Sequence, residues 1–216
     1  VHPISFEPIT NRLTQIRDLG INRVLMFKNN RFLNFDLNDN LKIMKILNYT
    51  EDSFSDGSVN YQQFDDVMQE LEEFNIDPKN VIVDIGCCST NPVKKDEQIT
   101  TELENKRCKE ILSYIRNRNE DIIISLDTYR NEVIKENLEN IDIINDIGFD
   151  FETRKQEISE ILKDNRDKCY VLNHVPCETF EELQKIEKSQ KANDPNITQN
   201  VYDTLINKFN YLIQND

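Results

Sequence analysis

Small or polar residues stand at the ends of the apolar runs in this chain of 216 residues, and their types could support binding chemistry. In chain order they are Asn48, Gly86, Asp127, the pair Asn145–Asp146, and His174. A carboxylate such as Asp127 and an amide such as Asn145 together offer the acceptors and donors that bind the edge of a flat heterocycle. A second interpretation stays open, in which Asp127 and Thr128 cap a helix over residues 129–139.

Three further features allow a chemical and a structural interpretation. The polar loop from Asn48 to Gly57 contains Phe54 and several carboxylates, so it could close over a ligand and a cation or simply form a solvated turn. His174 fits a proton carrier or a structural histidine. The vicinal pair Cys87–Cys88 favours buried packing over redox chemistry.

The elements that must position these residues are an alternation of strands and helices. Five runs rich in Ile, Val and Leu predict strands buried on both faces: Ile43–Leu47, Val81–Ile85, Ile122–Leu126, Ile141–Ile147 and Cys169–Leu172. Amphipathic helical patterns lie between and after them. This order predicts an α/β fold with a parallel sheet of about five βα units, either an open doubly wound sheet or part of a barrel. Both architectures bind ligands at the carboxyl ends of their strands.

Composition restricts the classes of function. The net charge of −14 gives no basic surface, so the sequence predicts no nucleic-acid partner. No apolar run reaches the length of a membrane span, so no membrane partner is expected. Five cysteines without a secretory pattern indicate reduced thiols inside the cell. Residues 1–40 lack the regular apolar pattern that marks the strands, and they are predicted to form an irregular linker.

Four stretches in order resemble dihydropteroate synthase, in the form found in fungal multifunctional folate-synthesis proteins. They are residues 43–57, 84–92, 124–130 and 142–147, which resemble the first four strands of that family with the loops that follow. Residues 1–15, which begin with Val1-His2-Pro3, resemble the segment that joins a preceding pyrophosphokinase domain to the synthase. The resemblance therefore implies a linker over residues 1–40 and a partial synthase domain over residues 41–216.

The resemblance implies an incomplete TIM (β/α)8 barrel that joins 4-aminobenzoate to a pterin methyl diphosphate with the help of Mg²⁺. Asp127 and Asn145 would hold the pterin ring, and Asn48 would lie beside the metal and the diphosphate; Asn48 and Asp127 are the expected catalytic residues. The aminobenzoate loop would comprise Phe54, Ser89, Thr90 and Pro92. A homodimer or fused folate-pathway domains are the expected protein partners, in the cytoplasm or the mitochondrion.

The sequence also departs from that family. Lys45 and Ser58 replace glycines, Asn91 replaces an arginine, and Asn173-His174 replaces a Met-His pair. Strands six to eight of the barrel are expected to be missing, so residues 1–216 alone are expected to lack synthase activity. The alternative function is a catalytically silent relative that serves as a pterin-binding or scaffold protein. A third interpretation, a methyltransferase relative with the same barrel, is disfavoured by the loop Asp52–Asp56.

Overall fold

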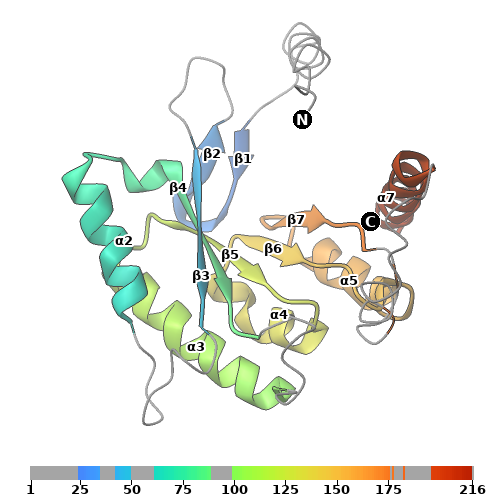
Figure 1. The fold of residues 1–216 in the computed structure, drawn as a ribbon, viewed down its shortest axis with the longest axis horizontal. Coiled ribbons are helices and arrows are strands. Elements are labelled where there is room, and N and C mark those ends of the chain that lie inside the picture. Colours follow the sequence, from blue (N-terminus) through green and yellow to red (C-terminus); the bar gives the residue numbers. More distant parts are fainter. Residues whose placement is uncertain are drawn as a thin grey trace, which may run out of the picture.

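The computed structural model describes residues 24–34, 42–49, 61–88, 99–175, 177, 182 and 196–215. Five strands form one parallel sheet in the order β3-β4-β5-β6-β7 (Figure 1). They are β3 (Ile43–Asn48), β4 (Val81–Gly86), β5 (Ile123–Asp127), β6 (Ile143–Asp146) and β7 (Cys169–Leu172). Each coincides with one of the five apolar runs, so the predicted strands are confirmed.

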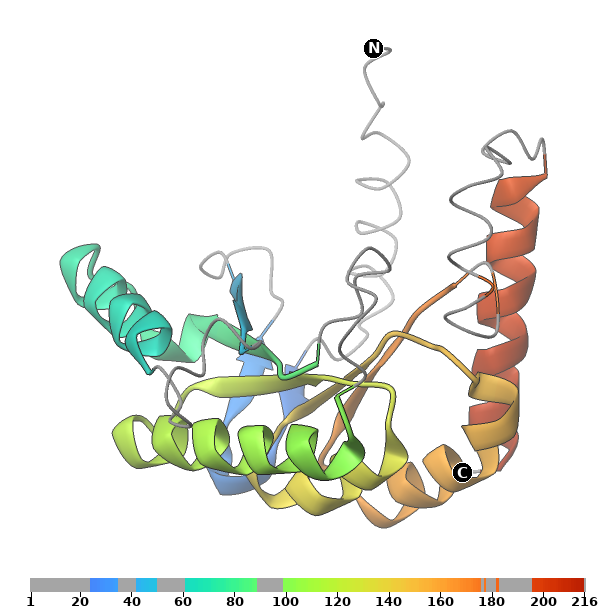
Figure 2. The same cartoon turned by 60° about the horizontal axis from the view of Figure 1, so that its bottom comes forward.

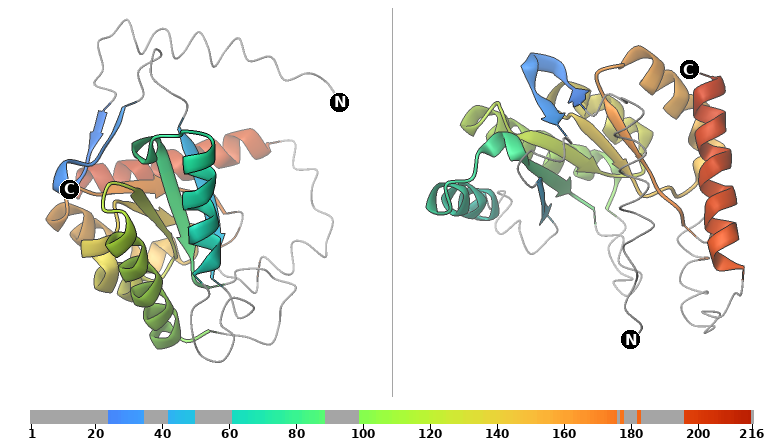
Figure 3. Two further views of the ribbon diagram at one scale, coloured as in Figure 1. Left: turned by 90° about the vertical axis from the view of Figure 1, so that its left-hand side faces the viewer. Right: turned by 90° about the horizontal axis from the view of Figure 1, so that it is seen from above.

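Helices cover one face of this sheet. The helices are α2 (Gln62–Glu73), α3 (Thr101–Arg118), α4 (Asn131–Asn137), α5 (Phe151–Asp164) and α7 (Ile197–Gln214). Buried side chains of α2 to α5 form one apolar core with alternate residues of the strands, such as Val83, Ile124 and Ile144. In Figure 2, α3, α4 and α5 run side by side along the same side of the curved sheet. Figure 3 shows α2 and α7 at opposite ends of it.

This arrangement decides between the two architectures left open by the sequence. A doubly wound sheet reverses its strand order and carries helices on both faces. Here the strands follow one another in chain order, and their connecting helices pack on one face. Among the described residues the sheet remains open, with β3 and β7 at its edges. The fold is an incomplete (β/α)8 barrel of five strands.

A hairpin corrects the prediction of an irregular linker over residues 1–40. β1 (Val24–Met26) and β2 (Phe32–Asn34) pair antiparallel around a short 3₁₀ turn at Lys28–Asn30. Phe27 and Leu33 pack on the sheet face opposite the helices, against Ile123 and Ile143. Because each strand is only three residues long, its apolar pattern is too short to stand out from a linker.

Buried charge fixes the hairpin to the amino ends of the strands. The Arg31 guanidinium donates to Asp142 Oδ1 from Nε at 3.0 Å and from Nη2 at 2.7 Å. Arg116 of α3 donates to the other oxygen, Asp142 Oδ2, at 2.6 Å. Asp142 is fully buried, so its charge depends on these two cations. The hairpin therefore closes the end of the sheet that lies away from the predicted binding residues.

Helix ends in this fold follow their local sequence. Thr100 Oγ1 accepts from Leu103 N at 3.3 Å and caps α3, whose last turn carries Arg116 and Arg118. α2 ends before Asn75, which adopts a left-handed φ of 52°, and Asp77-Pro78 then starts a 3₁₀ turn (Pro78–Asn80) that leads into β4. A second 3₁₀ turn, Leu138–Asn140, leads toward β6.

None of the helices in the described ranges has the length and apolarity to span a bilayer.

Candidate ligand site at the carboxyl edge of the sheet

Four of the residues singled out in the sequence form one row across neighbouring strands. Asn48 of β3 pairs in register with Gly86 of β4, and Gly86 pairs with Asp127 of β5. Asp127 in turn pairs with Asn145 of β6. Residues in register share a face of a sheet, so the parallel alignment brings these four positions together at the carboxyl edge. They lie on the face opposite the helices.

Gly86 leaves the space that this row needs. A Cβ atom at Gly86 would lie 2.9 Å from Asn48 Oδ1 and 3.6 Å from Asp127 Oδ2. The first distance is shorter than van der Waals contact allows, so any side chain would displace the Asn48 amide. The glycine therefore lets an amide oxygen and a carboxylate oxygen from two different strands approach the same space.

Asp127 has an unusual electrostatic environment. Its side chain is half-buried, and three other carboxylates lie near enough to act on its charge. Burial, followed by the nearby charges of Asp84, Glu104 and Asp146, raises the pKa of Asp127 from 3.8 to about 7. Near neutral pH this group therefore exists both as a carboxylate that accepts and as an acid that donates. A raised pKa is typical of functional carboxyl groups.

The Asn145 amide is held between two side chains that the sequence analysis did not select. Asn145 Nδ2 donates to Asp84 Oδ1 and Oδ2 at 3.2 and 3.3 Å. Asn173 Nδ2 donates to Asn145 Oδ1 at 3.3 Å. Asp84 is buried two residues before Gly86 on the same face of β4. The sequence signal for Asp84 was the presence of a charged residue inside the apolar run Val81–Ile85. For Asn173 the only sequence signal was a polar residue directly after β7.

Asp127 and Thr128 do not occupy the N-cap of α4. α4 begins at Asn131 and its N-cap is Arg130, whose side chain makes no cap bond. Thr128 Oγ1 accepts from Arg130 N at 3.2 Å, in the turn just before the helix. Thr128 Oγ1 also donates to Glu104 Oε1 at 2.7 Å. Arg130 pairs with the other oxygen of this buried carboxylate and also donates to Ile99 O at 2.8 Å. Glu104 therefore anchors the loop that follows Asp127, which leaves the Asp127 side chain on the row.

Other predicted residues lie elsewhere or outside the described part of the chain. Asp146 faces the helices, where it accepts from Gly148 N, Arg154 and the Tyr170 hydroxyl. Cys87 is fully buried in the helix-side core, and burial raises the pKa of the Cys88 thiol; both observations agree with a packing role. The predicted aminobenzoate-loop residues Phe54, Ser89, Thr90 and Pro92 lie outside the described residues.

His174 and Lys45 show no hydrogen bond to the row within the described part of the chain. His174 is half-buried just beyond β7, and its buried Nδ1 has no hydrogen-bond partner among the described residues. Lys45, which stands where the resemblance has a glycine, faces the helices and donates to Glu70 of α2 at 2.8 Å. The proton-carrier interpretation of His174 stays a prediction.

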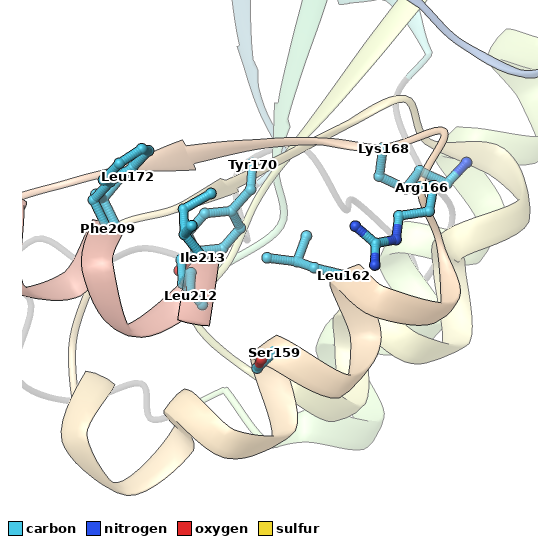
Figure 4. A pocket seen from close by; sticks show the side chains of 9 residues that line it. All are labelled: Ser159, Leu162, Arg166, Lys168, Tyr170, Leu172, Phe209, Leu212 and Ile213. Atoms are coloured by element: carbon cyan, nitrogen blue, oxygen red, sulfur yellow. The ribbon is translucent and has the colours of Figure 1, made fainter. Parts of the chain in front are cut away.

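A separate pocket of about 310 Å³ lies on the helix side of β7, between α5 and α7 (Figure 4). Its walls are mostly apolar, formed by Leu162, Tyr170, Leu172, Phe209, Leu212 and Ile213, with Arg166 and Lys168 at one end. The strand alternation places this pocket on the opposite face of the sheet from Asn145. It is therefore not part of the row.

Comparison with known protein families identifies the family of the chain that carries this row of residues. Residues 44–211, which include β4 to β7, all but the first residue of β3 and most of α7, match the family of pterin binding enzymes. The chain belongs to the pterin-binding enzyme family. The family match covers Asn48, Gly86, Asp127 and Asn145 together.

Relatives of this pterin-binding chain are folate-synthesis proteins. It is 34% identical to the folic acid synthesis protein fol1 of Pneumocystis carinii, over 68% of this chain and 20% of the relative. It is 37% identical to dihydropteroate synthase of Streptococcus pyogenes serotype M1, over 52% of this chain and 41% of the relative. The chain thus spans about one fifth of the fungal relative and two fifths of the bacterial one.

Solved structures show the same fold. Dihydropteroate synthase of Xanthomonas albilineans, determined with 4-aminobenzoic acid, matches with a TM-score of 0.65 at 21% identity, over 90% of this chain and 63% of that one. A Plasmodium falciparum HPPK-DHPS variant with pteroate matches with a TM-score of 0.63 at 24% identity, over the whole of this chain and 39% of that one. These likenesses support the incomplete barrel seen here.

Proposed function

We propose that this chain binds a pterin at the carboxyl edge of its sheet and contributes that half-site to a dihydropteroate synthase. The observation that carries the proposal is the row of Asn48, Gly86, Asp127 and Asn145 in register across four strands. A pterin is flat and carries ring N–H groups beside ring acceptors. Asp127 and the Asn145 amide offer the complementary groups on one side of an open face.

In the proposed reaction a pterin methyl diphosphate is joined to 4-aminobenzoate. The bond between the pterin methylene carbon and the diphosphate oxygen breaks, and the diphosphate leaves with its electron pair. The amine nitrogen forms a bond to that carbon and releases one proton. Asp127 and Asn145 would hold the ring so that the methylene lies where the amine can reach it, and positioning of this kind lowers the barrier by removing the cost of orienting two reactants.

The residues around Gly86 fit an Mg²⁺ ion. This hard cation prefers oxygen ligands and usually takes several of them from substrate phosphates and water. Asn48 Oδ1 lies beside the open space at Gly86 and would supply a protein oxygen there, while no cluster of three His, Cys, Asp or Glu side chains occurs within the described ranges. When bound, the ion would neutralise negative charge that builds on the leaving diphosphate.

A catalytically silent pterin-binding or scaffold protein is the second candidate. It is favoured by the open sheet, because the described strands place residues on only one side of the space that a closed barrel would surround. Both candidates require the ring to bind. They differ in whether this chain alone can join the two substrates.

Calorimetric titration with 6-hydroxymethyl-7,8-dihydropterin diphosphate in Mg²⁺ tests the shared part of the proposal. We expect binding by the wild-type chain and loss of binding by Asp127→Ala. The matched control is Asp121→Ala, because Asp121 is an exposed carboxylate that precedes the amino end of the same strand. A folded wild-type chain that shows no binding would refute the proposal. Product formation with added 4-aminobenzoate would then favour the enzyme over the silent relative.

We further propose that residues 1–40 connect residues 41–216 to a preceding pyrophosphokinase-like domain. The bifunctional name of the Arabidopsis thaliana relative and the joined name HPPK-DHPS of the Plasmodium falciparum structure support such a fusion. The aminobenzoate loop with Phe54, Ser89, Thr90 and Pro92, a homodimer, and a cytoplasmic or mitochondrial location belong to the same proposal. Cell fractionation with an antibody to the chain tests the location, and sedimentation equilibrium tests the dimer.

A further inference from the structure

We propose that Asn173 is a positioning residue that locks the Asn145 amide in the single orientation needed to read a pterin edge. The inference rests on the proposed function and adds a specificity-determining residue to that site. Asn173 lies directly after β7, where it contacts the β6 strand end. No sequence motif selected it, and the resemblance has a methionine at this position.

The orientation follows from which groups can donate. The backbone oxygen of Asp146 only accepts, and Asn173 Nδ2 donates to it at 2.8 Å. The same Nδ2 carries a second hydrogen, which it donates to Asn145 Oδ1. At the other end, the Asp84 carboxylate accepts from Asn145 Nδ2. The series of hydrogen bonds therefore ends on each side at oxygens that only accept, Asp146 O and the Asp84 carboxylate. Neither the Asn145 amide nor the Asn173 amide can flip without losing a bond.

The locked amide still has capacity for a ligand. An amide oxygen has two lone pairs, and Asn173 uses one of those on Asn145 Oδ1, so one acceptor position remains. It is held in a fixed direction next to Asp127. A ring edge that places a donor opposite this oxygen matches the site, whereas an edge that places an acceptor there does not. Asn173 thereby gives the site its preference for one orientation of the ring edge.

Asn173 is itself fixed by helix α7. The buried Lys208 ammonium donates to Asn173 O at 3.2 Å and to Gly148 O at 3.4 Å. It also lies 4.8 Å from the centre of the Phe151 ring. These contacts hold the end of β7 against the loop that follows β6, so the Asn173 side chain meets Asn145 with little freedom to move away.

The test compares Asn173→Leu and the nearly isosteric Asn173→Asp with wild type. Each removes the donor and leaves Asn145 Oδ1 unsupported. The matched control is Asn165→Leu, which deletes an amide that donates to Ile161 O at 2.8 Å within the α5 end. Side-chain amide ¹⁵N relaxation, with Asn145 assigned by substitution, reports the order of the Asn145 amide without any ligand. Titration with the dihydropterin diphosphate reports affinity.

We expect the Asn145 amide to become disordered in both Asn173 variants, and the dissociation constant to rise roughly 10-fold, the loss expected for one oriented hydrogen bond. The control should change neither. An Asn145 amide as ordered as in wild type in the Asp variant would overturn the inference, whatever its affinity. Absence of pterin binding by wild type would instead refute the proposed function, and the relaxation comparison would still decide the role of Asn173.

Discussion

Replacement of Asp127 by asparagine should make the stability of the protein less dependent on pH. The native environment raises the pKa of Asp127 from 3.8 to about 7, so the folded state binds this proton more tightly than the unfolded state does. A raised acid pKa means that stability is lost as pH rises from the unfolded to the folded value. Asp127→Asn removes the charge while keeping the shape, so this loss should disappear.

The magnitude follows from the shift. One pKa unit corresponds to about 1.36 kcal/mol, so the full shift of Asp127 corresponds to at most ~4 kcal/mol, reduced by solvent screening at its partly exposed oxygens. From about pH 5.5 to about pH 8, the wild type should lose up to roughly 2 kcal/mol relative to Asp127→Asn. This window avoids the sequence pI of about 4.7, near which the protein is least soluble.

Urea denaturation at a series of pH values measures this difference. The free energy of unfolding of Asp127→Asn is subtracted from that of wild type at each pH. The contributions of the two histidines and of the other charged groups then cancel, because both proteins share them. Asp121→Asn is the control and should run parallel to wild type, since Asp121 is 55% exposed. A difference between wild type and Asp127→Asn that does not change with pH would refute the reasoning, because it would mean that Asp127 titrates normally.

Three other substitutions test the packing around the site. Arg31→Met should destabilise the fold by ~3 kcal/mol, because it leaves the buried Asp142 with one cation. Urea denaturation checks this against the control Lys28→Met, which removes the exposed ion pair with Glu139. Equal losses of stability in the two variants would contradict the prediction. Gly86→Ala should weaken pterin binding at least ~10-fold, because the added Cβ displaces the Asn48 amide, while the melting temperature should change little. An unchanged pterin affinity in calorimetric titration would exclude this prediction. Gly148→Ala should cost roughly 1–2 kcal/mol, since φ is +90° and the added Cβ would lie 3.1 Å from Asn173 O; an unchanged urea midpoint would argue against that strain.

The strands and the row were accessible from sequence for a physical reason. A strand buried on both faces must be apolar along its whole length, so its ends are marked by the first polar residue. Asn48, Asp127 and Asn145 were found in that way. Parallel strands of one sheet then bring such ends together without any further information. Asp84 was missed because it lies inside its strand, where the pattern expects an apolar residue.

The choice between two architectures needed the packing. Apolar runs and helical periodicity are the same in a doubly wound sheet and in part of a barrel. The face on which each helix packs depends on contacts between residues far apart in the chain, such as Phe64 of α2 with Tyr114 of α3. The place of the hairpin, whose strands are too short to show a pattern, also depends on such a contact, because Arg31 binds Asp142, a residue 111 positions away.

The sequence by itself determined an acidic α/β chain with polar residues at its strand ends, since composition and periodicity are local properties, and the resemblance implied that these residues bind a pterin. Only the tertiary structure decided how those ends work together. It raised the pKa of Asp127 by partly burying the carboxyl group and, secondly, by placing other carboxylates nearby, and it opened the space beside Gly86 between two strands. It also set the orientation of the Asn145 amide through Asp84 and Asn173, because hydrogen bonds between strands exist only once those strands are aligned.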